Sequence, residues 1–169
     1  MATLHAQPYN LDAVGFYFES AEEFTTKAKG LTDCHGSPVE EFEIQFIDGD
    51  TGDAQLFEAC GINQANLDVW FDEVEALDPR EKVALFYLVG CAGYDLEQAQ
   101  EKIEDVILYE CRLREAAEEI FDECHLESIP EGVRCYIDYE KYARDLEQGG
   151  ELTEFEFANA TYTVNAGAL

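Results

Sequence analysis

The chain has 169 residues, of which 38 are Asp or Glu and only 10 are Lys or Arg, so its formal net charge is −28. Apolar residues make up 47% of the sequence and aromatic residues 12%. This composition excludes a disordered acidic tail, because such tails are poor in the aromatic side chains that build a core. The length fits one domain or a few small modules.

The acidic residues are spread over the whole chain. Residues 1–60 hold 12 acids and 2 bases, residues 61–100 hold 8 and 2, and residues 101–169 hold 18 and 6. Charge of one sign destabilises a compact state by self-repulsion, so we expect either adaptation to high salt or a surface whose charge has a function. A net charge of −28 matches about 48 Å of duplex DNA. A compact globule of this length is only about 40 Å across, which favours an elongated body.

Residues 1–61 are predicted to form an α+β module. Short strands are expected over 4–9 and 14–18. Ser20 and Glu23 have the spacing of a capping box, and Gly30 can end the helix that they begin.

The segment 40–47 is predicted to be a strand with an acidic outer face. Phe42 and Ile44 alternate with Glu41 and Glu43, which is the pattern of a half-buried strand. A short helix should follow over 53–60.

Residues 62–104 are predicted to form a bundle of short helices. One helix is expected over 66–77, and a second begins at Asp78-Pro79 with Glu81 three residues after the cap and runs to Cys91. A further helix should begin at Asp95.

Residues 105–169 are predicted to form a second α+β module, so the fold class is α+β with three small modules in an elongated arrangement. The elements expected in this module are a strand over 106–109, a helix over 113–123, a helix from Asp138 to about Glu147, and a hairpin with strands over 152–157 and 161–164.

Runs of acids without counter-charges are the main candidate functional feature. On an ordinary exposed helix, acids pair with Lys or Arg four residues away, but ten bases are too few for this. Carboxylates spaced several ångströms apart imitate the phosphates to which a DNA-binding protein is drawn. The residues predicted to form this acidic surface are Glu22, Glu23, Glu41, Glu43, Asp72, Glu73, Glu75, Glu101, Glu104, Asp105, Glu118, Glu119, Asp122, Glu123, Glu154 and Glu156.

Metal binding is not predicted. The loop from Asp48 to Asp53 departs from a calcium-binding EF-hand loop, because Gly52, Asp53 and Ala59 stand where an oxygen ligand, a glycine and a glutamate are needed. A calcium-binding protein that uses this loop nevertheless stays open as an alternative.

The two adjacent Cys-His pairs, Cys34-His35 and Cys124-His125, are also not predicted to bind metal, because neighbouring residues point apart on a helix or a strand. No phosphate-binding glycine loop or nucleophile motif is present, so we predict no catalytic residue, no cofactor and no enzyme activity.

The chain is also predicted to be a cytoplasmic protein with no membrane partner. No apolar run approaches 18 residues, and no secretory segment is visible. The six cysteines, none in a Cys-x-x-Cys pair, are therefore expected to be reduced thiols.

Several blocks of sequence resemble the ArdA family of antirestriction proteins. They are His5-Ala-Gln-Pro-Tyr-Asn10, Gly15-Phe-Tyr-Phe18, Pro38-Val-Glu-Glu-Phe-Glu-Ile-Gln-Phe-Ile-Asp48, Asn63-Gln-Ala-Asn66, Ile129-Pro-Glu131 and Tyr136-Ile-Asp-Tyr-Glu140. The blocks span nearly the whole chain.

The resemblance implies a protein encoded on mobile genetic elements that inhibits type I restriction-modification enzymes. Its partners would be the methyltransferase and specificity subunits, whose DNA groove it occupies as an imitation of bent B-form DNA, without itself binding nucleic acid. The resemblance also implies an elongated homodimer of α+β, helical and α+β modules.

The family's antirestriction motif corresponds to Leu113–Pro130, and the resemblance assigns Leu113, Ala117, Phe121 and Glu123 to the motif and dimer region. The turn departs from the family, which commonly has Gly-Leu-Phe-Gly-Asp where this chain has Cys124-His-Leu-Glu-Ser128. The loss of two glycines removes positions that adopt a left-handed backbone easily. A different class of partner also stays open, namely other basic DNA-binding proteins such as nucleoid proteins or repressors.

Overall fold

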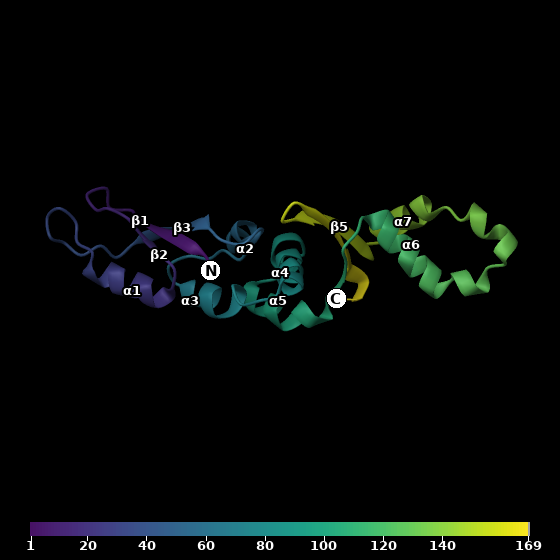
Figure 1. The fold of residues 1–169 in the computed structure, drawn as a ribbon, viewed down its shortest axis with the longest axis horizontal. Coiled ribbons are helices and arrows are strands. Elements are labelled where there is room, and N and C mark those ends of the chain that lie inside the picture. Colours follow the sequence, from purple (N-terminus) through teal and green to yellow (C-terminus); the bar gives the residue numbers. More distant parts are fainter. Residues whose placement is uncertain (169) are drawn as a thin grey trace. The chain divides into compact units, whose positions relative to one another are not determined.

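The computed structural model describes residues 1–168, which divide into two compact units: unit 1, Met1–Leu96, and unit 2, which begins at Glu97. Each unit combines helices with a three-stranded antiparallel sheet (Figure 1). The predicted α+β class is therefore confirmed. Residue 61, the predicted end of the first module, falls inside unit 1, and the division into three modules stays a prediction.

Unit 1 contains a sheet, helices and two π-helical turns. Its elements are β1 (Thr3–Pro8), β2 (Phe16–Phe18), α1 (Ala21–Gly30), β3 (Phe42–Asp48), α2 (Asp53–Ala59), α3 (Leu67–Val69), the π turn Trp70–Val74, α4 (Pro79–Phe86) and the π turn Tyr87–Cys91.

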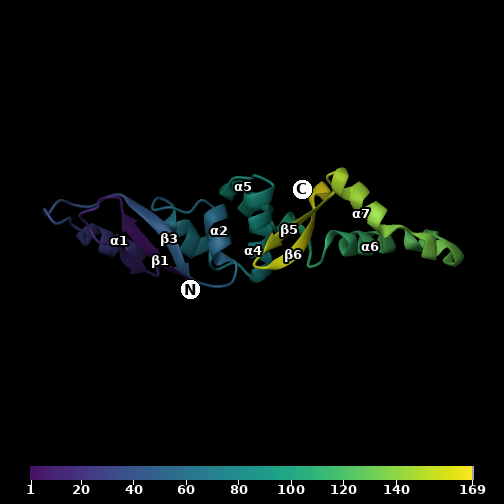
Figure 2. The ribbon, with the colours of Figure 1, turned by 90° about the horizontal axis from the view of Figure 1, so that it is seen from above.

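The sheet of unit 1 has the order β2-β1-β3, and Figure 2 shows β1 beside β3. Leu4 in β1 is fully buried and lies opposite Phe18 and Phe46. Phe24 of α1 packs against Phe18 with a ring separation of 5.1 Å and against Phe42 at 5.7 Å. The aromatic residues of the sequence thus form the core beneath an acidic surface.

Trp70 joins this sheet to the helices of the same unit. Its fully buried indole lies 5.9 Å from the ring of Phe46 in β3 and 5.1 Å from the ring of Phe57 in α2. Edge-to-face packing of this kind adds to the hydrophobic gain from burial.

The predicted helix starts are confirmed. Asp78 Oδ1 accepts hydrogen bonds from the N–H groups of Arg80 and Glu81, and the Asp78 N–H donates to the Glu81 carboxylate, which completes a capping box. At α1 the Ser20 hydroxyl accepts from the Glu23 N–H as expected, but the Glu23 carboxylate accepts from Glu19.

The helices expected over 66–77 and 79–91 differ from the prediction in one respect, because each ends in a π-helical turn. The hydrogen bond from Glu75 N–H to the Trp70 carbonyl spans five residues. Trp70 and Val74, at the two ends of this π turn, are both fully buried.

Unit 2 packs two helices against a sheet of order β4-β6-β5. Its elements, with α5 beginning at the boundary, are α5 (Leu96–Lys102), a 3₁₀ turn Ile103–Asp105, β4 (Ile107–Tyr109), α6 (Leu113–Cys124), 3₁₀ turns Leu126–Ser128 and Glu131–Tyr136, α7 (Tyr139–Gln148), β5 (Leu152–Phe157), β6 (Ala160–Asn165) and a 3₁₀ turn Ala166–Ala168.

In unit 2, helices α6 and α7 meet β5 through a cluster rich in small residues. Ala117 of α6, Ala143 of α7 and Leu152 of β5 are buried together. Because alanine has a single methyl group, α6 and α7 can lie close side by side (Figures 1 and 2). The β5–β6 hairpin closes through Ala158 and Asn159, whose φ angles of 54° and 64° define a tight turn.

No helix within residues 1–168 has the length and apolar character needed to cross a membrane.

One ion pair lies in the interior of unit 1. Lys82 Nζ of α4 donates to Asp53 Oδ1 of α2 at 2.8 Å, and the two side chains are 11% and 2% exposed. Among the described acids and bases, these two residues are the buried ones. The pair fixes α2 on α4, because either charge alone would be costly to bury.

Replacing Lys82 by Met should therefore destabilise the protein by about 3–5 kcal/mol, since the Asp53 carboxylate would stay buried without its partner. Urea unfolding measures this loss. Arg114→Met is the control, because it breaks an exposed pair with Glu118 and should change stability by less than about 1 kcal/mol. Equal effects of the two substitutions would contradict the structural role of the buried pair.

Candidate functional site

The predicted acidic surface is largely exposed to solvent. Its residues come from both units. Unit 1 carries nineteen acids and four bases, and unit 2 carries nineteen acids and six bases. The exposed members are Glu22, Glu41, Glu43, Asp72, Glu73, Glu101, Glu104, Asp105, Glu119, Glu123, Glu154 and Glu156.

The remaining four members, Glu23, Glu75, Glu118 and Asp122, are half-buried. Glu23 lies 2.7 Å from Lys27. The hydrogen bond from Lys27, with the backbone hydrogen bond from Glu19, lowers the pKa of Glu23. The charged carboxylate is thus favoured in the folded state, and its contribution to stability is lost as the pH falls into the acid range.

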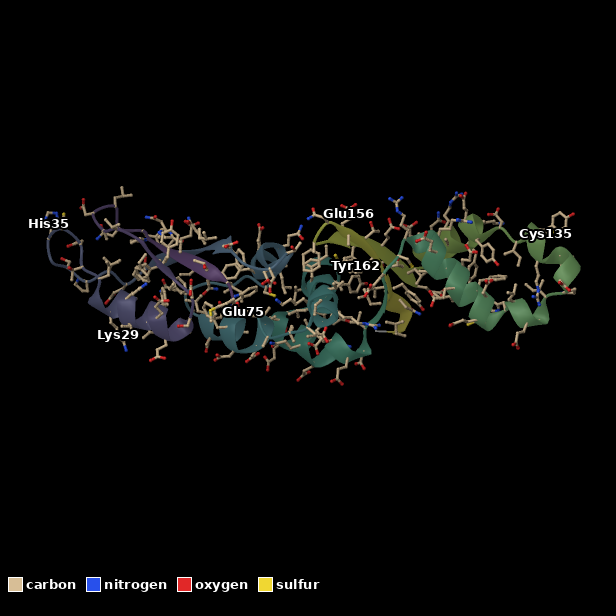
Figure 3. The ribbon with its side chains drawn as sticks, in the orientation of Figure 1. Lys29, His35, Glu75, Cys135, Glu156 and Tyr162 are labelled. Carbon is tan, nitrogen blue, oxygen red and sulfur yellow. The ribbon has the colours of Figure 1, made fainter. Side chains whose placement is uncertain are left out.

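Glu75 has a structural position in unit 1 (Figure 3). Its carboxylate accepts a hydrogen bond from the Ala2 N–H and lies 3.4 Å from the terminal amine of Met1. Its 18% exposed side chain therefore holds the start of β1 and leaves little charge for a partner.

The strand acids face uncharged neighbours. Glu43 lies opposite Gln7 in the sheet of unit 1. In unit 2, Glu154 lies opposite Thr163 and Glu156 opposite Thr161. Glu156 projects from the β5–β6 hairpin (Figure 3). No base sits across the ladder from these three carboxylates, so cross-strand pairing does not neutralise them.

The four acids near the end of α6 separate into two groups. Glu118 lies 3.8 Å from Arg114, and Asp122 accepts a 2.7 Å hydrogen bond from the Tyr139 hydroxyl of α7. Glu119 and Glu123 are exposed. The tertiary structure thus involves the first two in contacts within the chain and leaves the other two at the surface.

Glu119 and Glu123 continue a row that begins at Glu115. We call these three exposed residues, spaced four apart, the α6 acidic face. Burial, together with the charges of Glu119 and Glu123, raises the pKa of Tyr109. Burial and the charges of Glu115, Glu119 and Glu154 raise the pKa of Cys111. These shifts mark a local negative potential to which α6 and β5 both contribute.

Helix α6 approaches the charge density of a single DNA strand. It has twelve residues with five acids and one base, a net charge of −4 over about 18 Å. That is one net charge per roughly 4.5 Å, against one per 3.4 Å along a single DNA strand.

Glu115 was not among the predicted surface residues. Its position four residues before Glu119 is a helical i,i+4 spacing that could have identified it. Its carboxylate also accepts a hydrogen bond from the Arg112 N–H. Glu154 has a second role of the same kind, because its Oε2 accepts from the Leu113 N–H at 2.7 Å and so caps α6.

The apolar residues of the motif region pack inside unit 2. Ala117 is fully buried, and Leu113 packs against the cluster around it. The Phe121 ring lies 5.0 Å from that of Tyr142 and 5.5 Å from that of Tyr139, both in α7. These contacts give the motif a role in the core of its own chain, while Glu123 remains exposed.

The turn that lacks the family's glycines has an ordinary backbone. Leu126–Ser128 forms a 3₁₀ turn, and His125 has a φ of −126°. Within the described residues, positive φ angles occur at Ala158, Asn159 and five glycines elsewhere. The loss of the two glycines therefore forces no left-handed strain here.

The carboxylates of Asp48, Asp50 and Asp53 do not gather around a shared position that could hold a cation. Asp53 is occupied by the Lys82 ammonium, and Asp48 accepts from the Gly49 N–H at 3.1 Å. Asp50 is exposed. An ammonium group therefore already neutralises the one buried carboxylate of this loop.

Among known proteins, the chain matches one family model. The model of a family described as "Antirestriction protein (ArdA)" matches residues 11–161. The chain belongs to the ArdA family. Nothing among the curated proteins or the solved structures matches it. Membership of the ArdA family indicates an antirestriction function. The matched residues include α6 and the acidic strand residues Glu43, Glu154 and Glu156.

The ArdA chain should melt at higher temperature as salt rises. Between about 0.01 M and 0.15 M ionic strength the Debye length falls from about 30 Å to about 8 Å, which weakens self-repulsion among the acids. We expect Tm to rise by roughly 5 °C, equivalent to about 1 kcal/mol for units of this size. Scanning calorimetry measures the change, and a neutral osmolyte at equal osmolarity is the control. A flat response to salt would contradict strong repulsion.

Proposed function

We propose that the chain is a DNA mimic that inhibits type I restriction-modification enzymes by occupying the DNA groove of their methyltransferase and specificity subunits. The observation that supports this best is α6, whose net charge per unit length approaches that of a DNA strand. The exposed acids of β3 and β5, whose cross-strand neighbours are uncharged, add further negative charge to the surface. The target works in the cytoplasm, and the proposal places the inhibitor there too.

The mechanism is competition for a basic groove. A DNA-binding protein gains much of its affinity when Lys and Arg contact phosphates and counterions are released. Carboxylates at comparable spacing attract the same side chains. Occupancy of the groove needs no bond making or breaking, so the inhibitor acts stoichiometrically, with neither catalysis nor a cofactor.

The binding energy is spread over many contacts. An exposed ion pair is worth about 0.2–1 kcal/mol, so neutralising one carboxylate should weaken inhibition by less than about five-fold. The α6 acidic face offers three such groups in one row, and reversing all three adds repulsion to the loss of attraction.

The test is displacement of labelled DNA from a type I methyltransferase core. The inhibitor is titrated into the enzyme–DNA complex at about 0.05 M and 0.2 M salt, where affinities that depend on phosphate contacts differ strongly. We expect displacement at a fixed stoichiometry that weakens as salt rises. Glu115→Lys/Glu119→Lys/Glu123→Lys should reduce the apparent affinity by at least about ten-fold, or 1.4 kcal/mol.

The matched control changes the same amount of charge on α7, with Glu140→Lys/Asp145→Lys/Glu147→Lys, three exposed acids outside the predicted surface. Circular dichroism verifies that both triple variants fold. Equal loss in the two variants would show that total charge alone matters. Absence of displacement by the parent chain, with binding to nucleoid proteins or repressors instead, would replace the proposed target by another basic protein.

The proposal includes a homodimer, and exposed apolar residues beyond α6 support an interface there. All six residues of Glu131–Tyr136 are exposed, with Val133 at 48% and Tyr136 at 82%. These two side chains lie three residues apart in the turn that directly follows the motif region Leu113–Pro130, which the resemblance links to the dimer contact, and grouped apolar side chains at a surface suit an interface.

Light scattering on the eluting protein should therefore give twice the 19.1 kDa chain mass. Val133→Glu/Tyr136→Glu should shift the protein to the monomer, because two charges would enter the interface. Leu11→Glu is the control, since Leu11 is a 96% exposed apolar residue in unit 1, and it should leave the mass unchanged. A monomeric parent chain, or dissociation by the control alone, would refute this interface.

A further inference from the structure

Two loops of unit 1 bring together three side chains that are metal donors. Asp12 lies between β1 and β2, and Cys34 and His35 lie in the loop after α1, where Figure 3 labels His35. One ligand atom from each residue lies within 4.8 Å of the other two. Among the residues that the structure describes, this is the one group of three such donors close enough to share an ion.

The expectation that adjacent Cys and His side chains point apart is wrong for Cys34-His35. It assumed a helix or a strand, whereas this segment is a turn. Gly36 adopts a φ of +83°, and its N–H donates to the Asp33 carbonyl at 3.0 Å. The tight turn directs both side chains to the side on which Asp12 lies.

The arrangement is held by hydrogen bonds that do not use the three donor atoms. The Asp33 carboxylate accepts from the His35 N–H at 2.9 Å, from the Ser37 N–H at 2.8 Å and from the Asn10 side chain at 3.2 Å. The Cys34 N–H donates to the Asp12 carbonyl at 3.1 Å, which ties the two loops together. The donors are thus positioned by the backbone before any ligand binds.

The donor set fits zinc. A thiolate, an imidazole and a carboxylate are its usual ligands, and tetrahedral bonds of about 2.0–2.3 Å place neighbouring ligand atoms about 3.3–3.6 Å apart. The His35 Nε2 and Asp12 Oδ2 atoms are already 3.9 Å apart, so small side-chain rotations close the site. A sulfur ligand disfavours Ca²⁺ and Mg²⁺, which take oxygen ligands.

We propose that Asp12, Cys34 and His35 bind one Zn²⁺ ion, with the fourth coordination position open to water or to a donor atom from another molecule. This site is separate from the proposed DNA-mimic surface, because none of its three residues belongs to that surface.

Isothermal titration with Zn²⁺ and spectroscopy with Co²⁺ test the site. We expect one Zn²⁺ per chain, and a Co²⁺ complex with the near-ultraviolet thiolate charge-transfer band and strong visible bands of a four-coordinate ion. Cys34→Ser and His35→Ala should each weaken Zn²⁺ binding by at least about ten-fold, and Cys34→Ser should abolish the thiolate band. Asp12→Asn should weaken binding and keep that band.

The second Cys-His pair provides a matched control. Cys124 and His125 are also adjacent and exposed, but they belong to no such group of three donors in the described residues. Cys124→Ser/His125→Ala should leave the Zn²⁺ titration unchanged, and excess Ca²⁺ should not compete. Loss of the site in this control, or Zn²⁺ binding that survives Cys34→Ser, would overturn the proposal. DNA displacement by Cys34→Ser without metal should match the parent, which keeps the two proposals separately testable.

Discussion

Repulsion among carboxylates is the constraint on which the rest of the structure depends. With 38 acids and 10 bases, most carboxylates have no cation to accompany them out of water, and burying a lone charge is prohibitive. Among the described acids, Asp53 alone is buried, and it is met by Lys82. The interior is consequently apolar, with aromatic rings around Trp70 in unit 1 and with both small residues such as Ala117 and large ones such as Phe157 in unit 2.

Backbone N–H groups stabilise several carboxylates that would be paired with Lys or Arg in a less acidic protein. Asp78 and Glu81 cap α4, Glu115 and Glu154 accept from the first residues of α6, and Asp33 accepts two N–H groups of its own turn. Amide groups at a helix start carry a partial positive charge and lack partners within the helix. An acidic chain can thus stabilise its helices with the groups that it has in excess.

The same use of carboxylates makes the acidic surface uneven. Asp122 accepts a hydrogen bond from the Tyr139 hydroxyl, and Glu75 lies beside the terminal amine of Met1, so both carboxylates are engaged in contacts within the chain. Glu119 and Glu123 remain in solvent, and their charges add to burial in raising the pKa of Tyr109. A partner that reads phosphates would therefore meet exposed carboxylates of which some, such as Glu115 and Glu154, also accept hydrogen bonds from backbone amides.

The sequence by itself determined the charge, the α+β class, the family and the position of most elements, because capping residues and alternating apolar residues act over a few neighbouring positions. It predicted the α4 capping box and the acidic face of β3. It did not predict the π turn at Trp70, since the spacing of apolar residues is nearly the same for an α-helix and for a single π turn. Only tertiary structure decided that Asp53 is buried against Lys82, and that Cys34-His35 meets Asp12. Both depend on contacts between segments distant in sequence, which spacing along the chain does not encode.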